Sequence, residues 1–142
     1  MPIINFRNCH IGQNYIGALI DEPSTYQISF NNCELFNCWE SGILCTSSET
    51  DIRINGCSFN NIGTVNANGE SILIRDGKSI NITSNIFRVG DNPPVATFYG
   101  IKLEGTIEQA CIDGNCFLGI PNDYNSTATV NQLLIADNIS NN

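Results

Sequence analysis

Two acidic residues, Asp76 and Glu104, each come just after a short apolar segment of the same kind. A glycosidase uses two carboxyl groups about 5–9 Å apart, one on each side of the bond that it cleaves. If the two apolar segments are neighbouring strands, the acids lie one strand spacing apart, which is within this range. The sequence therefore offers Asp76 and Glu104 as a candidate catalytic pair.

The same two acids also fit a purely electrostatic role. Arg75 directly precedes Asp76, and the strand spacing would let it pair with Glu104 in the next strand. A nearby cation favours the ionised carboxylate, whereas a general acid needs a raised pKa. The local composition therefore favours a row of salt bridges over a catalytic dyad, and we expect binding without turnover.

Sugar binding requires aromatic rings that stack on sugar faces and polar groups that bond the hydroxyls. Residues of these types lie beside the apolar segments of the same kind, and we predict them as a substrate-binding set: Trp39, Glu40, Glu70, Tyr99 and Tyr124. The alternative is that the aromatic residues pack the loops against the core.

Other functions find little support in the composition. The net charge of −8 argues against nucleic acid and anionic membranes as partners. The sequence contains neither an apolar run long enough to insert in a membrane nor a recognisable signal peptide. With His10 as the single histidine and no C-x-x-C pair, a catalytic triad and a zinc site are both poor fits. We expect no metal and no cofactor.

The seven cysteines recur inside apolar patterns and do not form a dense disulfide framework. Three of them, Cys9, Cys33 and Cys57, are spaced 24 residues apart. We interpret the cysteines as reduced thiols that act as small buried hydrophobic groups, which suits a reducing cytoplasm.

An internal repeat defines the elements that hold these residues. Its template is apolar-x-apolar-x-x-(Cys/Asn)-x-apolar, and successive copies begin 24, 24, 28 and 30 residues apart. The five copies are residues 4–11, 28–35, 52–59, 80–87 and 110–117. Short alternating segments are typical of β-strands, and repetition at this period indicates a solenoid.

A second apolar segment accompanies each copy, at residues 17–20, 42–45, 71–74, 100–103 and 132–135. We therefore predict an all-β fold, a right-handed parallel β-helix of about five coils, in one domain over residues 1–142. A leucine-rich repeat has a similar template, but here Ile and Phe outnumber Leu in it. Because neither end carries a helical cap, we expect the chain to be a fragment of a longer protein.

Stacking of like positions predicts two ladders inside the tube. The corner position aligns residues that are small or can bond the turn backbone: Cys9, Cys33, Cys57, Asn85 and Asn115. The last template position aligns an aromatic stack that aliphatic residues continue: Phe59, Phe87 and Phe117, then Leu35 and Ile11.

The second apolar segments also place large side chains outside the tube. If Ile43 and Cys45 point inward, the outward row contains Leu19, Leu44, Leu73, Lys102 and Leu134. Exposed apolar rows mark contacts with loops or with other subunits. We expect this row to be covered in a homotrimer.

These features carry a resemblance over most of the chain. The G-I-x-L strand, the I-x-I-x-x-N-x-F corner and the variable loop before the next strand resemble the pectate-lyase-like right-handed β-helix. The Asn-rich, weakly charged form is most similar to bacteriophage tailspike and tail-fibre proteins, and Asn occurs 21 times. The catalytic motif of the pectate lyases is absent from the sequence.

The resemblance implies a virion-tail protein that is usually a homotrimer and that binds or cuts bacterial surface polysaccharide. The chain would then be a tailspike-type receptor-binding segment, which in some members belongs to a depolymerase. Because fold alone does not define chemistry, a non-enzymatic structural shaft or carbohydrate-binding module is the alternative.

Overall fold

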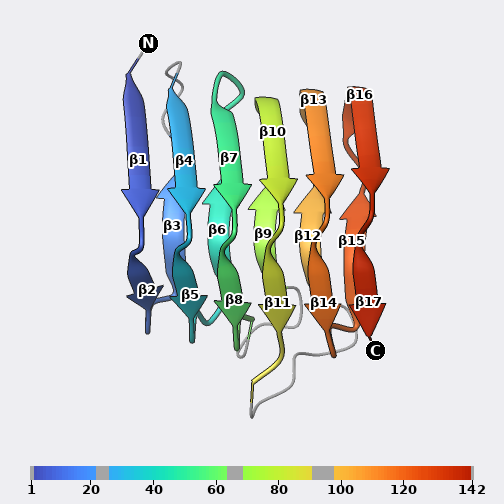
Figure 1. Ribbon diagram of the computed structural model, residues 1–142. Coiled ribbons are helices and arrows are strands. Elements are labelled where there is room, and N and C mark those ends of the chain that lie inside the picture. Colours follow the sequence, from blue (N-terminus) through green and yellow to red (C-terminus); the bar gives the residue numbers. More distant parts are fainter. Residues whose placement is uncertain (1, 22–25, 64–68, 91–97, 142) are drawn as a thin grey trace.

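The computed structural model describes residues 2–21, 26–63, 69–90 and 98–141, and these residues form short strands without any helix. The strands build three parallel sheets that wind into a right-handed β-helix of about five turns (Figure 1). In Figure 1 each coil runs down the front of the tube, returns behind it, and then steps sideways to the next coil. The predicted all-β parallel β-helix is confirmed.

Sheet A carries the first half of the repeat template in β1 (Ile3–Arg7), β4 (Gln27–Asn31), β7 (Asp51–Asn55), β10 (Gly77–Thr83), β13 (Thr106–Asp113) and β16 (Thr129–Ala136). Sheet B follows the corner in β2 (His10–Gly12), β5 (Glu34–Phe36), β8 (Ser58–Asn60), β11 (Ile86–Arg88), β14 (Cys116–Leu118) and β17 (Ile139–Asn141). Sheet C contains β3 (Ile16–Ile20), β6 (Ser41–Cys45), β9 (Glu70–Ile74), β12 (Tyr99–Leu103) and β15 (Asn122–Ser126). Like positions thus stack in successive coils, about 4.8 Å apart.

A residue in the left-handed conformation turns the chain between sheet A and sheet B. The φ angles at these corners lie between 48° and 62° for Asn8, Asn32, Gly56, Ser84, Gly114 and Asp137. Gly and Asn adopt this conformation at the lowest cost. Gly56 also provides space, because a Cβ atom there would lie 2.6 Å from the side-chain oxygen of Asn32. The residue before the Cys/Asn position of the template is therefore Asn or Gly in most coils, because the backbone there has a positive φ.

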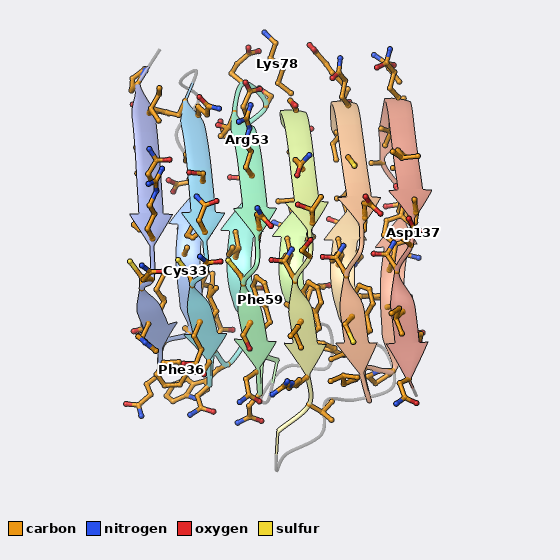
Figure 2. The ribbon with its side chains drawn as sticks, in the orientation of Figure 1. Cys33, Phe36, Arg53, Phe59, Lys78 and Asp137 are labelled. Atoms are coloured by element: carbon orange, nitrogen blue, oxygen red, sulfur yellow. The ribbon has the colours of Figure 1, made fainter. Side chains whose placement is uncertain are left out.

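The residue after each corner forms the predicted internal ladder, which Figure 2 shows at Cys33. Asn85 Oδ1 accepts a hydrogen bond from the Cys57 N–H at 2.8 Å, and Asn85 Nδ2 donates to the Ile54 carbonyl at 2.9 Å. Asn115 makes the equivalent two bonds one coil further on. Each buried amide therefore joins the backbones of neighbouring coils, and its polar atoms are satisfied inside the tube.

The predicted aromatic stack is also confirmed, and it runs along sheet B. The ring centroids of Phe59 and Phe87 are 4.8 Å apart, and those of Phe87 and Phe117 are 4.7 Å apart. Leu35 and Ile11 continue the row in register toward the N-terminus. Figure 2 shows Phe59 on β8, in the middle of the tube.

Small residues of sheet C leave the room that the aromatic stack needs. A Cβ atom on Gly42 would lie 3.0 Å from the Phe59 ring, and one on Gly100 would lie 2.6 Å from the Phe117 ring. The glycines that open two of the second apolar segments, Gly42 and Gly100, are therefore explained by packing inside the tube.

The assignment of residues 132–135 to the second apolar segment is wrong. These residues lie in β16, which pairs with β13 in sheet A and places Leu133 beside Ala110 and Ile135 beside Ile112. The segment begins a sixth copy of the template, whose corner amide is Asn138. The last strand of sheet C is instead the polar β15. An apolar triplet fits strands of either sheet, so only the corner that follows it identifies the sheet.

The predicted apolar row outside sheet C is not continuously exposed. Leu44 and Leu73 lie outside the core cluster, but they are only 8% and 5% exposed. Leu19 is 53% exposed, whereas Leu134 lies in sheet A and its expected place in sheet C is taken by Asn125. The described surface therefore offers no leucine stripe to a second subunit.

The rows of inward-facing side chains are not covered by a further coil at either end of the described solenoid. In the first coil Ile4 is partly exposed, and Phe6 stacks on Phe30 beside an apolar concavity of about 520 Å³. In the last coil Leu133 and Ile135 of the same rows are also partly exposed. Equivalent residues of the middle coils are buried because they have a neighbouring coil on both sides.

Candidate functional site

Four of the candidate residues lie in or directly after two neighbouring strands of sheet C, β9 and β12: Glu70, Asp76, Tyr99 and Glu104. Glu70 begins β9 and pairs in register with Tyr99, which begins β12. Lys102 lies within β12 and pairs with Leu73, which is outside the core cluster. Glu104 follows β12, and its N–H group bonds back to the end of β9. Coil stacking therefore brings together residues that are far apart in the sequence.

Four charged side chains form a connected group, which we call the acid–lysine cluster: Glu70, Arg75, Lys102 and Glu104. The Lys102 ammonium lies 2.9 Å from Glu104 Oε1 and 3.4 Å from Glu70 Oε1. Arg75 Nε lies 3.4 Å from Glu104 Oε2, which confirms the predicted pairing of these two residues. The Lys102 Nζ is also 5.9 Å from the centre of the Tyr99 ring, within the range of a cation–π interaction.

The two carboxyl groups of the cluster have different environments. Burial raises the pKa of Glu70, and the nearby Lys102 only partly opposes this shift. The hydrogen bond from Lys102 lowers the pKa of Glu104, and the charge of Arg75 acts in the same direction. Two carboxyl groups with opposite pKa shifts are the pattern seen in acid–base pairs of enzymes.

Lys102 nevertheless lies between these carboxyl groups. Because Glu70 Oε1 and Glu104 Oε1 both contact Lys102 Nζ, the two oxygens are at most about 6 Å apart, close to the separation in retaining glycosidases. The ammonium group, however, occupies the space that a glycosidic oxygen would need. The arrangement is better suited to bonding sugar hydroxyls than to moving a proton.

Asp76 belongs to a turn beside this cluster. Its Oδ1 accepts a hydrogen bond from the Thr106 N–H at 2.9 Å. A Cβ atom on Gly105 would lie 2.5 Å from the same oxygen, so the next coil passes close to the Asp76 carboxylate. Asp76 and Glu104 thus lie in neighbouring coils, as expected, but their carboxylates bond to different partners.

The predicted binding residues occupy three kinds of position. Tyr99 and Glu70 lie at the acid–lysine cluster. Trp39 and Glu40 precede β6, one coil earlier than Glu70, and the Trp39 side chain is 50% exposed. Tyr124 pairs in register with Ile101, a core residue of β12, and packs against the core.

Lys102 is the central residue of the cluster, and the sequence reasoning did not identify its role. The sequence pattern predicts it only as a member of the outward row of sheet C, where the in-register residues of the preceding coils are leucines. A lysine in such a row indicates a carboxylate partner, because its charge has to be compensated where its stem is packed. The lysine in this row therefore indicates Glu70 and Glu104 as its carboxylate partners.

Among the described residues, no three His, Cys, Asp or Glu side chains are placed to hold a metal ion together. The same part of the chain contains no helix that is long and apolar enough to cross a membrane.

No family model matches the chain, and no curated protein or solved structure matches it either. The class of protein is therefore defined by the fold itself. The chain is a parallel β-solenoid, and it carries a charged and aromatic cluster along one of its three sheets.

Proposed function

We propose that this β-helix is a tailspike-type receptor-binding segment that recognises a bacterial surface polysaccharide. The observation that carries the proposal is the Lys102 ammonium, which lies between two carboxylates and beside the Tyr99 ring. Such a surface combines hydrogen-bond donors, hydrogen-bond acceptors and an aromatic face. These are the groups that recognition of a sugar requires.

The solenoid suits a long ligand that repeats along its length. Positions of sheet C recur once per coil, about 4.8 Å apart along the tube axis, which is comparable with one sugar ring. The row at the start of its strands contains Ser41, Glu70, Tyr99 and Asn122 in register. Ser41 and Glu70 are buried, so a polysaccharide that lies along the axis would meet the partly exposed Tyr99 and Asn122 of this row.

Recognition without cleavage is the activity that we propose for these residues. Asp76 bonds to the Thr106 N–H, and Glu104 pairs with Lys102. A general acid requires a protonated carboxyl group near neutral pH, and the lowered pKa of Glu104 acts against this state. Depolymerase activity of the whole assembly would then come from other residues.

We also propose that the segment acts in a virion tail, as part of a homotrimer assembled in a reducing cytoplasm. All seven cysteines are free, and four of them are buried, which suits folding with reduced thiols. Because Leu44 and Leu73 are already buried within one chain, the trimer contact would have to use a surface other than the predicted leucine row.

A structural shaft is the second candidate function. The continuous amide and aromatic ladders favour it, because they stabilise a rigid rod irrespective of any ligand. In that case the acid–lysine cluster would only stabilise the outside of sheet C.

Binding of labelled polysaccharides tests the proposal. The probes are fluorescent capsular polysaccharides and lipopolysaccharide O-chains from a panel of bacteria, measured by fluorescence anisotropy. We expect saturable binding of at least one probe and a loss of about tenfold in affinity for Lys102→Met, which removes the charge but keeps the apolar stem. Lys78→Met is the matched control, because Lys78 is exposed on β10 and lies outside the cluster.

The outcomes separate the candidates. Absence of binding by every probe, with both variants normally folded, contradicts polysaccharide recognition and favours the shaft. Equal affinities of the Lys102→Met and Lys78→Met variants would place the binding surface elsewhere. Release of reducing ends that disappears in Asp76→Asn or Glu104→Gln would overturn recognition without cleavage.

A further inference from the structure

Two arginines, Arg7 and Arg53, border one shallow hollow on the outer face of sheet A. The hollow has a volume of about 300 Å³, and Figure 2 shows Arg53 on β7. Both arginines are exposed, and neither side chain forms an ion pair or a hydrogen bond with a described residue. Polar side chains line most of the remaining surface of the hollow: Asn5, Gln27, Ser29 and Asn31.

The charge of this hollow is opposite to that of the chain as a whole. The chain has 14 acidic and 6 basic residues, yet two of the basic residues and no described acidic residue line the hollow. Asp51 lies two residues before Arg53 on the same strand, but these two residues form no ion pair. Arg75, in contrast, is paired with Glu104. Positive charge gathered in a concave surface favours an anionic ligand.

Coil stacking places the two arginines diagonally on either side of a middle strand, β4. Arg53 is in register with Ser29 and Asn5, whereas Arg7 is in register with Asn31. The strands β1 and β7 are two coils apart, about 9–10 Å along the tube axis, and β4 with Ser29 and Asn31 lies between them. Because arginine has a long side chain, both guanidinium groups can reach one ligand above Ser29 and Asn31.

Side-chain hydrogen bonds hold the floor of the hollow in place. Asn31 Nδ2 donates to Ser29 Oγ at 3.2 Å, and Ser29 Oγ donates to Asn5 Oδ1 in the preceding coil. Ser29 is buried, so these bonds are shielded from water. An amide nitrogen carries two N–H groups, so Asn31 keeps one donor for a ligand. The hollow therefore offers hydrogen-bond donors from three successive coils, through Arg7, Asn31 and Arg53.

We infer that this hollow binds a phosphoryl group, either free phosphate or the phosphate ester of a small sugar. A carboxylate has two oxygens in one plane, and a single guanidinium group satisfies both with parallel hydrogen bonds. The oxygens of a tetrahedral phosphoryl group point in different directions, so this group can bond to donors from all three coils at once. The site lies on sheet A, whereas the acid–lysine cluster lies along sheet C, and it does not depend on the proposed function.

Titration of isotope-labelled protein, followed by NMR at constant ionic strength, tests the site. The probes are inorganic phosphate, glucose 1-phosphate and acetate. We expect inorganic phosphate to cause saturable shifts of the Nε–H signals of Arg7 and Arg53 and of the Asn31 side-chain amide, with one common dissociation constant. Arg7→Met and Arg53→Met should each weaken binding about fivefold or more, because each removes a charge-assisted hydrogen bond. Arg88→Met is the matched control, because it changes the net charge equally at an exposed position of sheet B.

The possible results separate the site from general effects of charge. Shifts that do not saturate, or that are equal at Arg7, Arg53 and Arg88, would overturn the site and leave the polysaccharide proposal standing. Acetate that binds as tightly as phosphate would overturn the choice of a phosphoryl group. Tighter binding of glucose 1-phosphate than of inorganic phosphate supports a sugar phosphate as the ligand, and the reverse order supports free phosphate. Thermal melting of each variant shows that losses of affinity do not come from unfolding.

Discussion

The side-chain oxygen of Asn85 accepts a hydrogen bond from the backbone N–H of Cys57, one coil earlier, at 2.8 Å. The amide nitrogen of Asn85 donates to the Ile54 carbonyl and to Asn115 Oδ1 in the following coil. One side chain therefore links its own coil to the coil before it and the coil after it. Apolar stacking resists separation of the coils, but these directional bonds also define their register.

Removal of the Asn85 amide should strongly destabilise the solenoid. We expect Asn85→Ala to lower the free energy of unfolding by roughly 2–4 kcal/mol, because the Cys57 N–H and the Ile54 carbonyl lose their partners inside the tube. Asn81→Ala, at a half-buried position of β10, should cost less than about 1 kcal/mol. Urea unfolding followed by circular dichroism measures both variants, and equal losses would contradict the role of the ladder.

The corner thiols should differ in reactivity according to their depth in the tube. Burial raises the pKa of Cys57 from 9.0 to about 11, so at pH 8 its thiolate fraction is about 100-fold below that of an unshifted thiol. Cys33 is buried as well, whereas Cys9 in the first coil is partly exposed, contrary to the expectation that the cysteines are buried.

We therefore expect iodoacetamide to modify Cys9 well before Cys33 and Cys57 in the folded protein. Mass spectrometry of peptides after timed labelling measures the three rates. In urea the rates should become similar, which serves as the control. Rapid labelling of Cys57 under native conditions would show that the corner opens readily.

The aromatic stack should tolerate a change of shape better than a loss of volume. Phe87 is fully buried between Phe59 and Phe117. Phe87→Ala should cost roughly 3–5 kcal/mol of unfolding free energy. Phe87→Leu should cost less than about 2 kcal/mol, because Leu35 already occupies this row. Denaturant titration of both variants checks the order, and a leucine variant as unstable as the alanine variant would refute it.

The acid–lysine cluster should give two opposite dependences of stability on pH. The folded pKa of Glu70 is raised by burial, so its contribution to stability is present below the ordinary glutamate pKa and is lost as pH rises through the raised value. The folded pKa of Glu104 is lowered by the Lys102 hydrogen bond. Its contribution is present above the ordinary pKa and is lost as pH falls through the lowered value.

Neutral substitutions separate these two effects. Glu70→Gln should remove the loss of stability on the high-pH side of the glutamate pKa, and Glu104→Gln should remove the loss on the low-pH side. Unfolding free energies of both variants and the native chain, measured between about pH 3 and pH 8, test this expectation. Parallel curves for all three proteins would show that neither carboxyl group is coupled to folding.

The sequence by itself determined the coil and the inside of the tube. Alternation with a period of two placed apolar side chains inward, and the Cys/Asn position of the template marked the corner, where the structure gives the preceding residue a positive φ. Like-on-like stacking then followed from parallel, in-register pairing, which is why the ladders through Asn85 and Phe87 could be predicted from a single template. Alternation, corner residues and stacking recur in every coil, so they can be predicted from the repeat template alone.

Only the tertiary structure decided what lies outside the tube and which sheet an ambiguous segment joins. Residues 132–135 fit either of two sheets by their apolar pattern, and their pairing with β13 places them in sheet A. The meeting of Glu70 with Lys102 and Glu104 depends on contacts between side chains of neighbouring coils. Because these contacts join different coils, no single repeat contains the information that would specify them.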